Sequence, residues 1–151
     1  EIIKNGDVGL VFQQFDLFPH FSVLKNITDA PIRVQKRKKE EVYAQARTLL
    51  KQMGLADREN AYPFQLSGGQ QQRVAIGRAL ITRPSLILAD EPTGNLDSQN
   101  SSEVIALLKE TSKKYEQTII MITHNRSIAQ TADRVLQVSD GTLTDFGRCR
   151  E

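Results

Sequence analysis

Two apolar runs in the second half of the chain restrict its fold more than any other feature. LILA, at residues 86–89, is uninterrupted and ends in two acids, and TIIMIT covers residues 118–123. Runs of this length without polar alternation are typical of parallel strands that are buried on both faces of a sheet. A helix is expected between them, with Asp97 or Asn100 as its N-cap, and a further strand at residues 134–139. Strands that alternate with helices predict an α/β fold with a mainly parallel sheet.

The first half of the chain carries one short strand followed by a long helical region. VGLVF, at residues 8–12, is a strand-like apolar run, whereas residues 39–53 repeat apolar positions with the period of a helix. A second helix is expected to begin at Ser67 or just after it. We therefore expect one domain at residues 1–151 with two parts, a helical subdomain at about 22–82 and a sheet core at 1–21 and 83–151.

The composition is that of an ordinary globular protein and gives no sign of a nucleic-acid partner. Hydrophobic residues make up 39% and charged residues 25%, and the formal net charge is only +2. No apolar run approaches the roughly 20 residues that span a bilayer. The one cysteine, Cys149, excludes a disulfide within the chain and favours a reducing compartment. Because residue 1 is glutamate rather than methionine, we expect a processed or truncated product.

A doubled glycine stands where the second helix is expected to begin, in the sequence LSGGQ at residues 66–70. A helix N-terminus leaves backbone N–H groups unpaired and carries a partial positive charge. Gly68 and Gly69 have no side chains, so an anion can approach those groups closely, and Ser67 can cap the helix or donate its hydroxyl to a phosphate oxygen. The alternative is a plain serine cap with glycines that permit a turn, and for these residues alone it is favoured.

Two acids follow the LILA run, at the strand end where α/β proteins place their ligands. Asp90 is a candidate ligand for Mg²⁺, through water, because Mg²⁺ gives up its hydration shell reluctantly. Glu91 is a candidate for polarising a water that attacks phosphorus. The alternative makes both acids loop residues or helix caps. It is the weaker interpretation, because a charge directly after a buried strand needs a partner.

Polar groups also follow the other two strand-like runs. His124 comes after TIIMIT and is a candidate for bonding a terminal phosphate or steadying the attacking water. Gln13 comes after VGLVF and is a candidate for a neutral oxygen ligand of Mg²⁺ or for orienting water. Taken singly, each favours a structural or solvated role. Taken together, these strand and helix ends indicate one site for a phosphate, a metal and a water.

In their order and spacing these stretches resemble the motifs of the ATP-binding cassette (ABC) ATPases. LSGGQ is identical to the signature motif of that family, and LILADEP resembles its Walker B strand with Glu91 as the catalytic glutamate. VFQQ resembles the Q-loop, with Gln13 as the matching glutamine. GNLD, which ends at Asp97, resembles the D-loop, and THN with His124 resembles the H-loop. The resemblance covers about residues 8–146 and implies a P-loop NTPase-like core with a helical subdomain.

The resemblance also implies how the site is divided between two subunits. Two cassettes pair head to tail and enclose two ATP molecules. The signature residues, together with the D-loop, contact nucleotide held by the opposite subunit: Ser67, Gly68, Gly69, Gln70 and Asp97. The remaining site residues act on the nucleotide and Mg²⁺ held by their own subunit: Asp90, Glu91, Gln13 and His124.

One motif of the family is absent from these 151 residues. The Walker A pattern G-x-x-x-x-G-K-[ST] does not occur, and no lysine follows a glycine. In the family this loop lies upstream of the Q-loop and supplies most of the grip on the β- and γ-phosphates. We therefore expect this chain to be the C-terminal part of a cassette and to be inactive alone. The alternative is a catalytically incomplete module that lends its signature motif in trans or acts only in dimerisation or regulation.

Two subfamilies are resembled at once. VFQQFDLFPHFSVLKN and LSGGQQQRVAIGRAL are similar to ATPases of polar amino-acid importers, whereas DEPTGNLDS and THNRSIAQTADRVLQVSDG are similar to those of lipoprotein-release and macrolide-export systems. The resemblance implies a nucleotide-binding subunit that couples ATP hydrolysis to transport. Its implied partners are a second ATPase subunit and integral membrane subunits, with no nucleic acid. Its implied place is cytoplasmic, on the inner face of the cell membrane.

Overall fold

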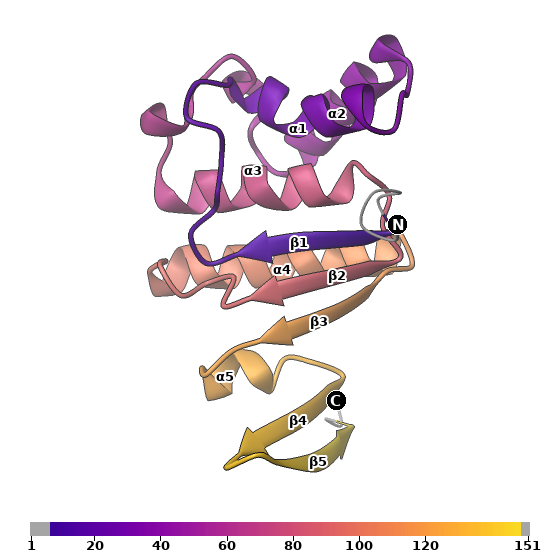
Figure 1. Cartoon of the computed structure of the whole chain (residues 1–151). Helices are drawn as coiled ribbons and strands as arrows, with labels where there is room; N and C mark the ends of the chain where they lie inside the picture. Colours follow the sequence, from indigo (N-terminus) through magenta and orange to yellow (C-terminus); the bar gives the residue numbers. More distant parts are fainter. Residues whose placement is uncertain (1–6, 149–151) are drawn as a thin grey trace. The chain divides into compact units, whose positions relative to one another are not determined.

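The computed structural model describes residues 7–148 (Figure 1), so Cys149 lies outside the described residues. The chain divides into two compact units, residues 1–121 and 122–151. The first unit contains, in order, β1 (Val8–Phe12), α1 (Val23–Arg33), α2 (Lys39–Gln52), the 3-10 turns η1 (Ala56–Arg58) and η2 (Pro63–Gln65), α3 (Gly68–Leu80), β2 (Leu86–Asp90), α4 (Ser98–Lys114) and β3 (Thr118–Ile122), whose last residue opens the second unit.

The sheet of the first unit confirms the predicted α/β architecture. Its strand order is β1-β2-β3, and β1 pairs with β2 in parallel. The arrows of all three strands run in the same direction in Figure 1. The register pairs Phe12 with Asp90, so both strands end level with each other. Gln13 and Glu91 therefore follow neighbouring strands at the same edge of the sheet.

Only one face of this sheet is covered within the described residues, so the expectation that LILA and TIIMIT are buried on both faces is wrong here. Ile87 is buried and belongs to the same apolar core cluster as residues of α3 and α4. The side chains that alternate with the buried ones are open: Leu88 is 37% exposed, Ile120 52% and Ile122 63%. An uninterrupted apolar run predicts a strand that can be covered on both faces of the sheet. The run does not supply the segment that covers the second face.

Helical residues make up the rest of the first unit. The helix predicted at residues 39–53 is confirmed as α2, whose buried face includes Val42, Ala46 and Leu49. Residues 34–38 link the end of α1 to the start of α2. The predicted boundaries of a helical subdomain, at 22 and 82, stay a prediction.

The second unit contains α5 (Arg126–Ala129), β4 (Arg134–Ser139) and β5 (Thr142–Arg148). α5 is a single short helix, and β4 lies where the sequence predicts a strand, at residues 134–139. β4 and β5 pair antiparallel, and Ser139 opposite Thr142 closes a two-residue turn of Asp140 and Gly141, both with positive φ. Across the described part of the chain, no helix has the length and apolar character required to cross a membrane.

Candidate functional site

The carboxyl ends of β1 and β2 bring two of the predicted site residues to one edge. Asp90 is the last residue of β2 and is exposed, and Glu91 follows it half-buried. Glu91 has a φ of +43°, in the left-handed region that non-glycine residues rarely occupy. A residue kept in this conformation is held there by its surroundings, and such residues cluster at functional sites. The backbone at Glu91 is thus consistent with the catalytic role expected of it.

Gln13 is held at the same edge by the segment that precedes α4. Its Nε2 donates to Oδ1 of Asn95 over 3.2 Å, and the Asn95 Nδ2 donates back to the Gln13 carbonyl over 3.1 Å. A Cβ atom at Gly94 would lie 2.5 Å from the Gln13 Nε2, so a side chain there would displace the Gln13 amide from this position. Gln13 and the segment before α4 are therefore joined by two hydrogen bonds, which the sequence did not predict because the partners lie 82 residues apart.

The signature residues form the N-terminal cap of α3, as expected. The Ser67 Oγ accepts from the Gln70 N–H over 3.2 Å, and the Gln70 Oε1 accepts from the Ser67 N–H over 3.0 Å. This reciprocal pair is a capping box, and it satisfies two donors at the start of the helix. Ser67 is exposed, and its role as an acceptor leaves its hydroxyl proton able to donate to an anion.

The two glycines of the signature differ in what surrounds them. A Cβ at Gly69 would lie 2.0 Å from Oδ1 of Asn100, so this glycine permits the close approach of α3 to the start of α4. A Cβ at Gly68 would lie 3.5 Å from Leu96 and 3.6 Å from Phe15, which is ordinary van der Waals contact. Gly69 thus has a packing reason inside the chain. Gly68 has none that these contacts show.

Asp97 is the N-cap of α4, one of the two positions predicted for it. Its carboxylate accepts from the Asn100 backbone N–H and side-chain Nδ2, each over 2.8 Å. The backbone hydrogen bond from Asn100 is the main cause that lowers the pKa of Asp97 below its usual 3.8, and the side-chain bond adds to it. The role of Asp97 that the structure describes is therefore that of a helix cap.

Arg78 of α3 fixes the Q-loop beyond Gln13. Its Nη1 donates to the carbonyl of Asp16 over 2.6 Å, and its Nη2 donates to the carbonyl of Phe15 over 3.0 Å. Both loop residues have positive φ, 36° for Phe15 and 51° for Asp16. Burial lowers the pKa of the Arg78 guanidinium, while the charge of Asp16 raises it. The guanidinium fork thus holds a turn that the backbone would not adopt unaided.

His124 lies in the second unit, two residues after β3, and its side chain is exposed. Next to it, Asn125 caps α5 through its Oδ1, which accepts from the N–H groups of Ser127 and Ile128. The predicted histidine therefore follows a strand end, as the sequence indicates.

The residues at the strand ends suit Mg²⁺ in kind. Asp90 offers a carboxylate and Gln13 an amide oxygen, since the bond to Asn95 uses only the Gln13 nitrogen. Among residues 7–148, no group of three or more His, Cys, Asp or Glu side chains is arranged to hold a metal. Mg²⁺ ordinarily takes one or two protein ligands, with water and phosphate oxygens as the rest. Asp90 and Gln13 would hold the ion, which would neutralise phosphate charge there.

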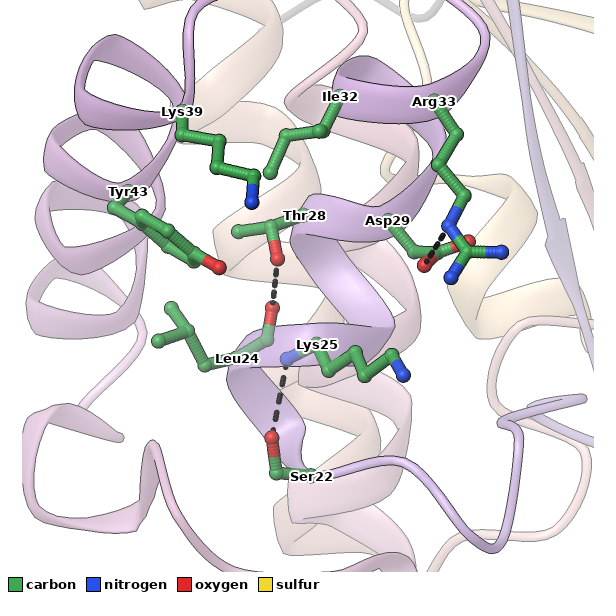
Figure 2. A pocket seen from close by; sticks show the side chains of 9 residues that line it. All are labelled: Ser22, Leu24, Lys25, Thr28, Asp29, Ile32, Arg33, Lys39 and Tyr43. Atoms are coloured by element: carbon green, nitrogen blue, oxygen red, sulfur yellow. Dashed lines mark hydrogen bonds and ion pairs between the residues drawn. The ribbon is translucent and has the colours of Figure 1, made fainter.

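A separate cavity lies between α1 and α2 and contains none of the predicted site residues. Its volume is about 350 Å³ (Figure 2), and its lining carries Lys25, Arg33 and Lys39. Arg33 is paired with Asp29 over 3.1 Å, and the ammonium of Lys25 lies 4.0 Å from the ring centre of Phe21. The cavity is therefore a feature of the helical region and not of the strand ends.

Sequence comparison identifies relatives along nearly the whole chain. The profile of the family described as ABC transporter matches residues 2–94. The chain is 45% identical over 145 residues to the arginine transport ATP-binding protein ArgV of Corynebacterium glutamicum, which covers 95% of this chain and 57% of the relative. It is 40% identical over 148 residues to the lipoprotein-releasing system ATP-binding protein LolD 2 of Rhodopirellula baltica. That alignment covers 94% of this chain and 58% of the relative.

Structural comparison agrees with the sequence comparison. The dimeric post-hydrolysis structure of the ATP-binding cassette MJ0796 bound to ADP and Pi matches with a TM-score of 0.81 and 36% identity, over 99% of this chain and 66% of that chain. This chain spans 57% of the length of the ArgV relative. Amino-acid transport and lipoprotein release, the two resemblances expected from the sequence, both occur among the relatives. From its signature sequence, its sheet and these relatives, the chain belongs to the ABC transporter family.

Proposed function

We propose that this chain is part of a nucleotide-binding subunit that couples ATP binding and hydrolysis to transport across a membrane. Glu91 polarises the water that attacks the terminal phosphate. Asp90 and Gln13 would hold Mg²⁺, which would supply positive charge that neutralises the phosphates, and His124 donates a hydrogen bond to the terminal phosphate. The relatives named as transport ATP-binding proteins support this assignment.

The register of β1 and β2 is the observation that carries this proposal. Because Phe12 pairs with Asp90, the next residue of each chain segment, Gln13 and Glu91, leaves the sheet at the same edge. Ligands of α/β proteins bind outside the carboxyl ends of parallel strands. An amide oxygen and two carboxylates at that edge fit a phosphate–magnesium–water arrangement better than they fit a purely structural role.

The signature end of α3 serves a nucleotide held by a second ATPase subunit in a head-to-tail dimer. The contacts at Gly68 support this, because they leave room for a side chain and so do not explain the glycine. A phosphate oxygen that approaches the helix N-terminus closely would explain it. The dimeric structure of the cassette MJ0796 agrees with such a pairing. The residues proposed to contact the partner's ATP are Ser67, Gly68, Gly69, Gln70 and Asp97.

Two further assignments rest on the same family membership. We propose that the membrane partners are integral transporter subunits and that the ATPase lies on the cytoplasmic face of the membrane. The second candidate function is a catalytically incomplete module that lends its signature motif in trans.

A hybrid cassette tests the proposed function. In it, this chain follows the part of the arginine-transport relative that it does not cover, where the Walker A loop of the family is expected. We expect no ATP hydrolysis by the 151-residue chain alone and Mg²⁺-dependent hydrolysis by the hybrid. A hybrid that binds ATP without hydrolysing it, yet stimulates a Walker A-bearing partner, supports the second candidate instead.

Asp90→Asn in the hybrid tests the metal assignment. Because the substitution removes a charge that holds Mg²⁺, we expect the Mg²⁺ concentration for half-maximal turnover to rise at least about tenfold. Asp133→Asn, at an exposed position of the second unit, is the matched control and is expected to leave it unchanged. An unaltered Mg²⁺ requirement in Asp90→Asn would contradict the assignment.

A further inference from the structure

Three consecutive glutamines follow the two glycines that begin α3, and their side chains make different contacts. Gln70 closes the capping box with Ser67. Gln71 donates from Nε2 to the carbonyl of Leu66 over 3.3 Å, a bond within the same turn. Gln72 is different, because both of its hydrogen bonds reach segments far away in the sequence.

Gln72 is fully buried, at 0% exposure, and it joins the ends of two strands. Its Nε2 donates to the carbonyl of Phe12, the last residue of β1, over 3.2 Å. The same nitrogen donates to the carbonyl of Pro92, two residues after β2 ends. One amide group therefore links α3 to the backbone immediately before Gln13 and immediately after Glu91.

The chemistry of this contact indicates that position 72 requires the N–H donors of the glutamine side chain. The Oε1 of Gln72 is buried and has no hydrogen-bond partner among the residues described. Burying an unpaired carbonyl oxygen is unfavourable, so an apolar residue would suit this place better if packing alone mattered. The neighbouring positions at helical spacing are indeed apolar: Ala75, Ile76 and Ala79 are all buried. In the sequence, Gln72 can be recognised as a polar residue among apolar positions on one face of the helix.

We propose that Gln72 is a positioning residue that fixes Gln13 and Glu91 through the carbonyls of Phe12 and Pro92. Because it belongs to the signature helix, both groups keep their position relative to that helix, and a shift of α3 on nucleotide contact moves them together. This inference rests on the proposed function, in which Gln13 and Glu91 act on nucleotide. It adds a residue outside the expected motifs that sets their geometry without touching substrate.

Gln72→Met in the hybrid cassette tests the inference by turnover. Methionine keeps the length of the side chain and removes both donors. We expect kcat for ATP to fall about 10- to 100-fold, because small displacements of reacting groups cost up to about 100-fold, with KM unchanged within a factor of about two. Gln71→Met, one position earlier and bonded only to Leu66, is the matched control and is expected to keep both constants.

A loss of stability alone must be distinguished from a loss of positioning. Leu50→Ala, in the core of α2 and remote from the strand ends, is expected to lower the melting temperature without lowering kcat. The inference is overturned if Gln72→Met keeps kcat within a factor of two of the parent. It is also overturned if, at an equal loss of melting temperature, kcat falls no further in Gln72→Met than in Leu50→Ala.

Hydrogen exchange tests the same contact without relying on catalysis. In Gln72→Met, we expect backbone amides at residues 13–16 and 93–96 to exchange at least about tenfold faster, because the link that protects these segments from local opening is gone. Gln71→Met should exchange like the parent. Unchanged exchange in Gln72→Met overturns the inference. An inactive parent hybrid would contradict the proposed function while exchange still decides the role of Gln72.

Discussion

The strand ends and the signature end of α3 carry the two halves of the proposed site, and the chain holds them in different ways. At the strand ends, Gln13 is bonded to Asn95, and Glu91 keeps a left-handed backbone conformation. At the signature end, Ser67 and Gln70 form a capping box with each other. The hydrogen bonds at the first region join distant segments, whereas those that cap the second are local.

This difference shows where fold and chemistry can be separated by mutation. A change at the strand ends affects groups that are tied to the rest of the first unit. At the signature end, the neighbours Gly68 and Gly69 already separate the two effects, because a side chain at Gly69 meets Asn100 and one at Gly68 meets only ordinary contacts. The predictions below test this contrast.

The largest effect is expected for Glu91→Gln in the hybrid cassette. The amide keeps the shape of the side chain but cannot act as a base, so kcat should fall at least about 100-fold. The melting temperature should change little, because the left-handed backbone is kept. Steady-state ATP hydrolysis and a thermal melt measure both quantities. Glu110→Gln, at an exposed position of α4, is the control. Turnover that survives in Glu91→Gln would remove the proposed base.

The two glycines of the signature should differ in their effect on stability. Gly69→Ala forces Asn100 to move, and we expect a loss of about 1–3 kcal/mol in the free energy of unfolding, as for other overpacked sites. Gly68→Ala has room and should stay within about 0.5 kcal/mol of the parent. Denaturant unfolding of both variants measures the difference.

A double-mutant cycle identifies the cause of the Gly69 effect. Asn100→Ala removes Oδ1 and Cγ, the two atoms that an alanine at position 69 would meet most closely, so the combined variant should be more stable than the sum of the single losses predicts. Strict additivity would show that the contact with Asn100 is not the reason for the glycine.

A smaller difference is expected between two substitutions of Glu91. The position has a φ of +43°, which a Cβ atom disfavours by about 1–2 kcal/mol and which glycine adopts freely. Glu91→Gly should therefore be about 1 kcal/mol more stable than Glu91→Ala, which reverses the usual order in regular structure. Denaturant unfolding compares the pair directly. An alanine variant as stable as the glycine variant would mean that the backbone is not strained there.

The smallest expected effect is a pH dependence at the α4 cap. The pKa of Asp97 is lowered in the folded chain, so its carboxylate contributes stability at pH values above 3.8, and this contribution is lost as the pH falls through the lowered value. Asp97→Asn keeps a good cap but does not titrate. Between about pH 5 and pH 2, the parent should lose more stability than Asp97→Asn. Equal losses would show that the cap does not depend on the charge.

Local signals in the sequence predicted most of the elements. Short apolar runs placed β1, β2 and β3, and the serine before the doubled glycine placed the start of α3. Such signals act within a few residues, so they can be seen without the fold.

Contacts between distant segments were beyond the reach of the sequence. Nothing near Gln13 indicates that Asn95 holds it, and nothing near Gly69 indicates that Asn100 lies above it. The same limit applies to the open face of the sheet at Leu88 and Ile120, since coverage depends on which layers pack there. The candidate site was predicted residue by residue, but the bonds that fix it were not.

Mixing two inactive hybrid variants tests most directly the central claim that the signature motif acts on nucleotide held by the partner. One variant carries Gly68→Val, which blocks the helix N-terminus, and the other carries Glu91→Gln. In a head-to-tail dimer, the mixed pair contains one site with an intact glutamate facing an intact signature. We expect turnover to return to roughly a quarter of the parent value, as random pairing in a two-fold dimer predicts. If the mixture stays as inactive as either variant alone, the signature motif acts within its own subunit and the claim is wrong.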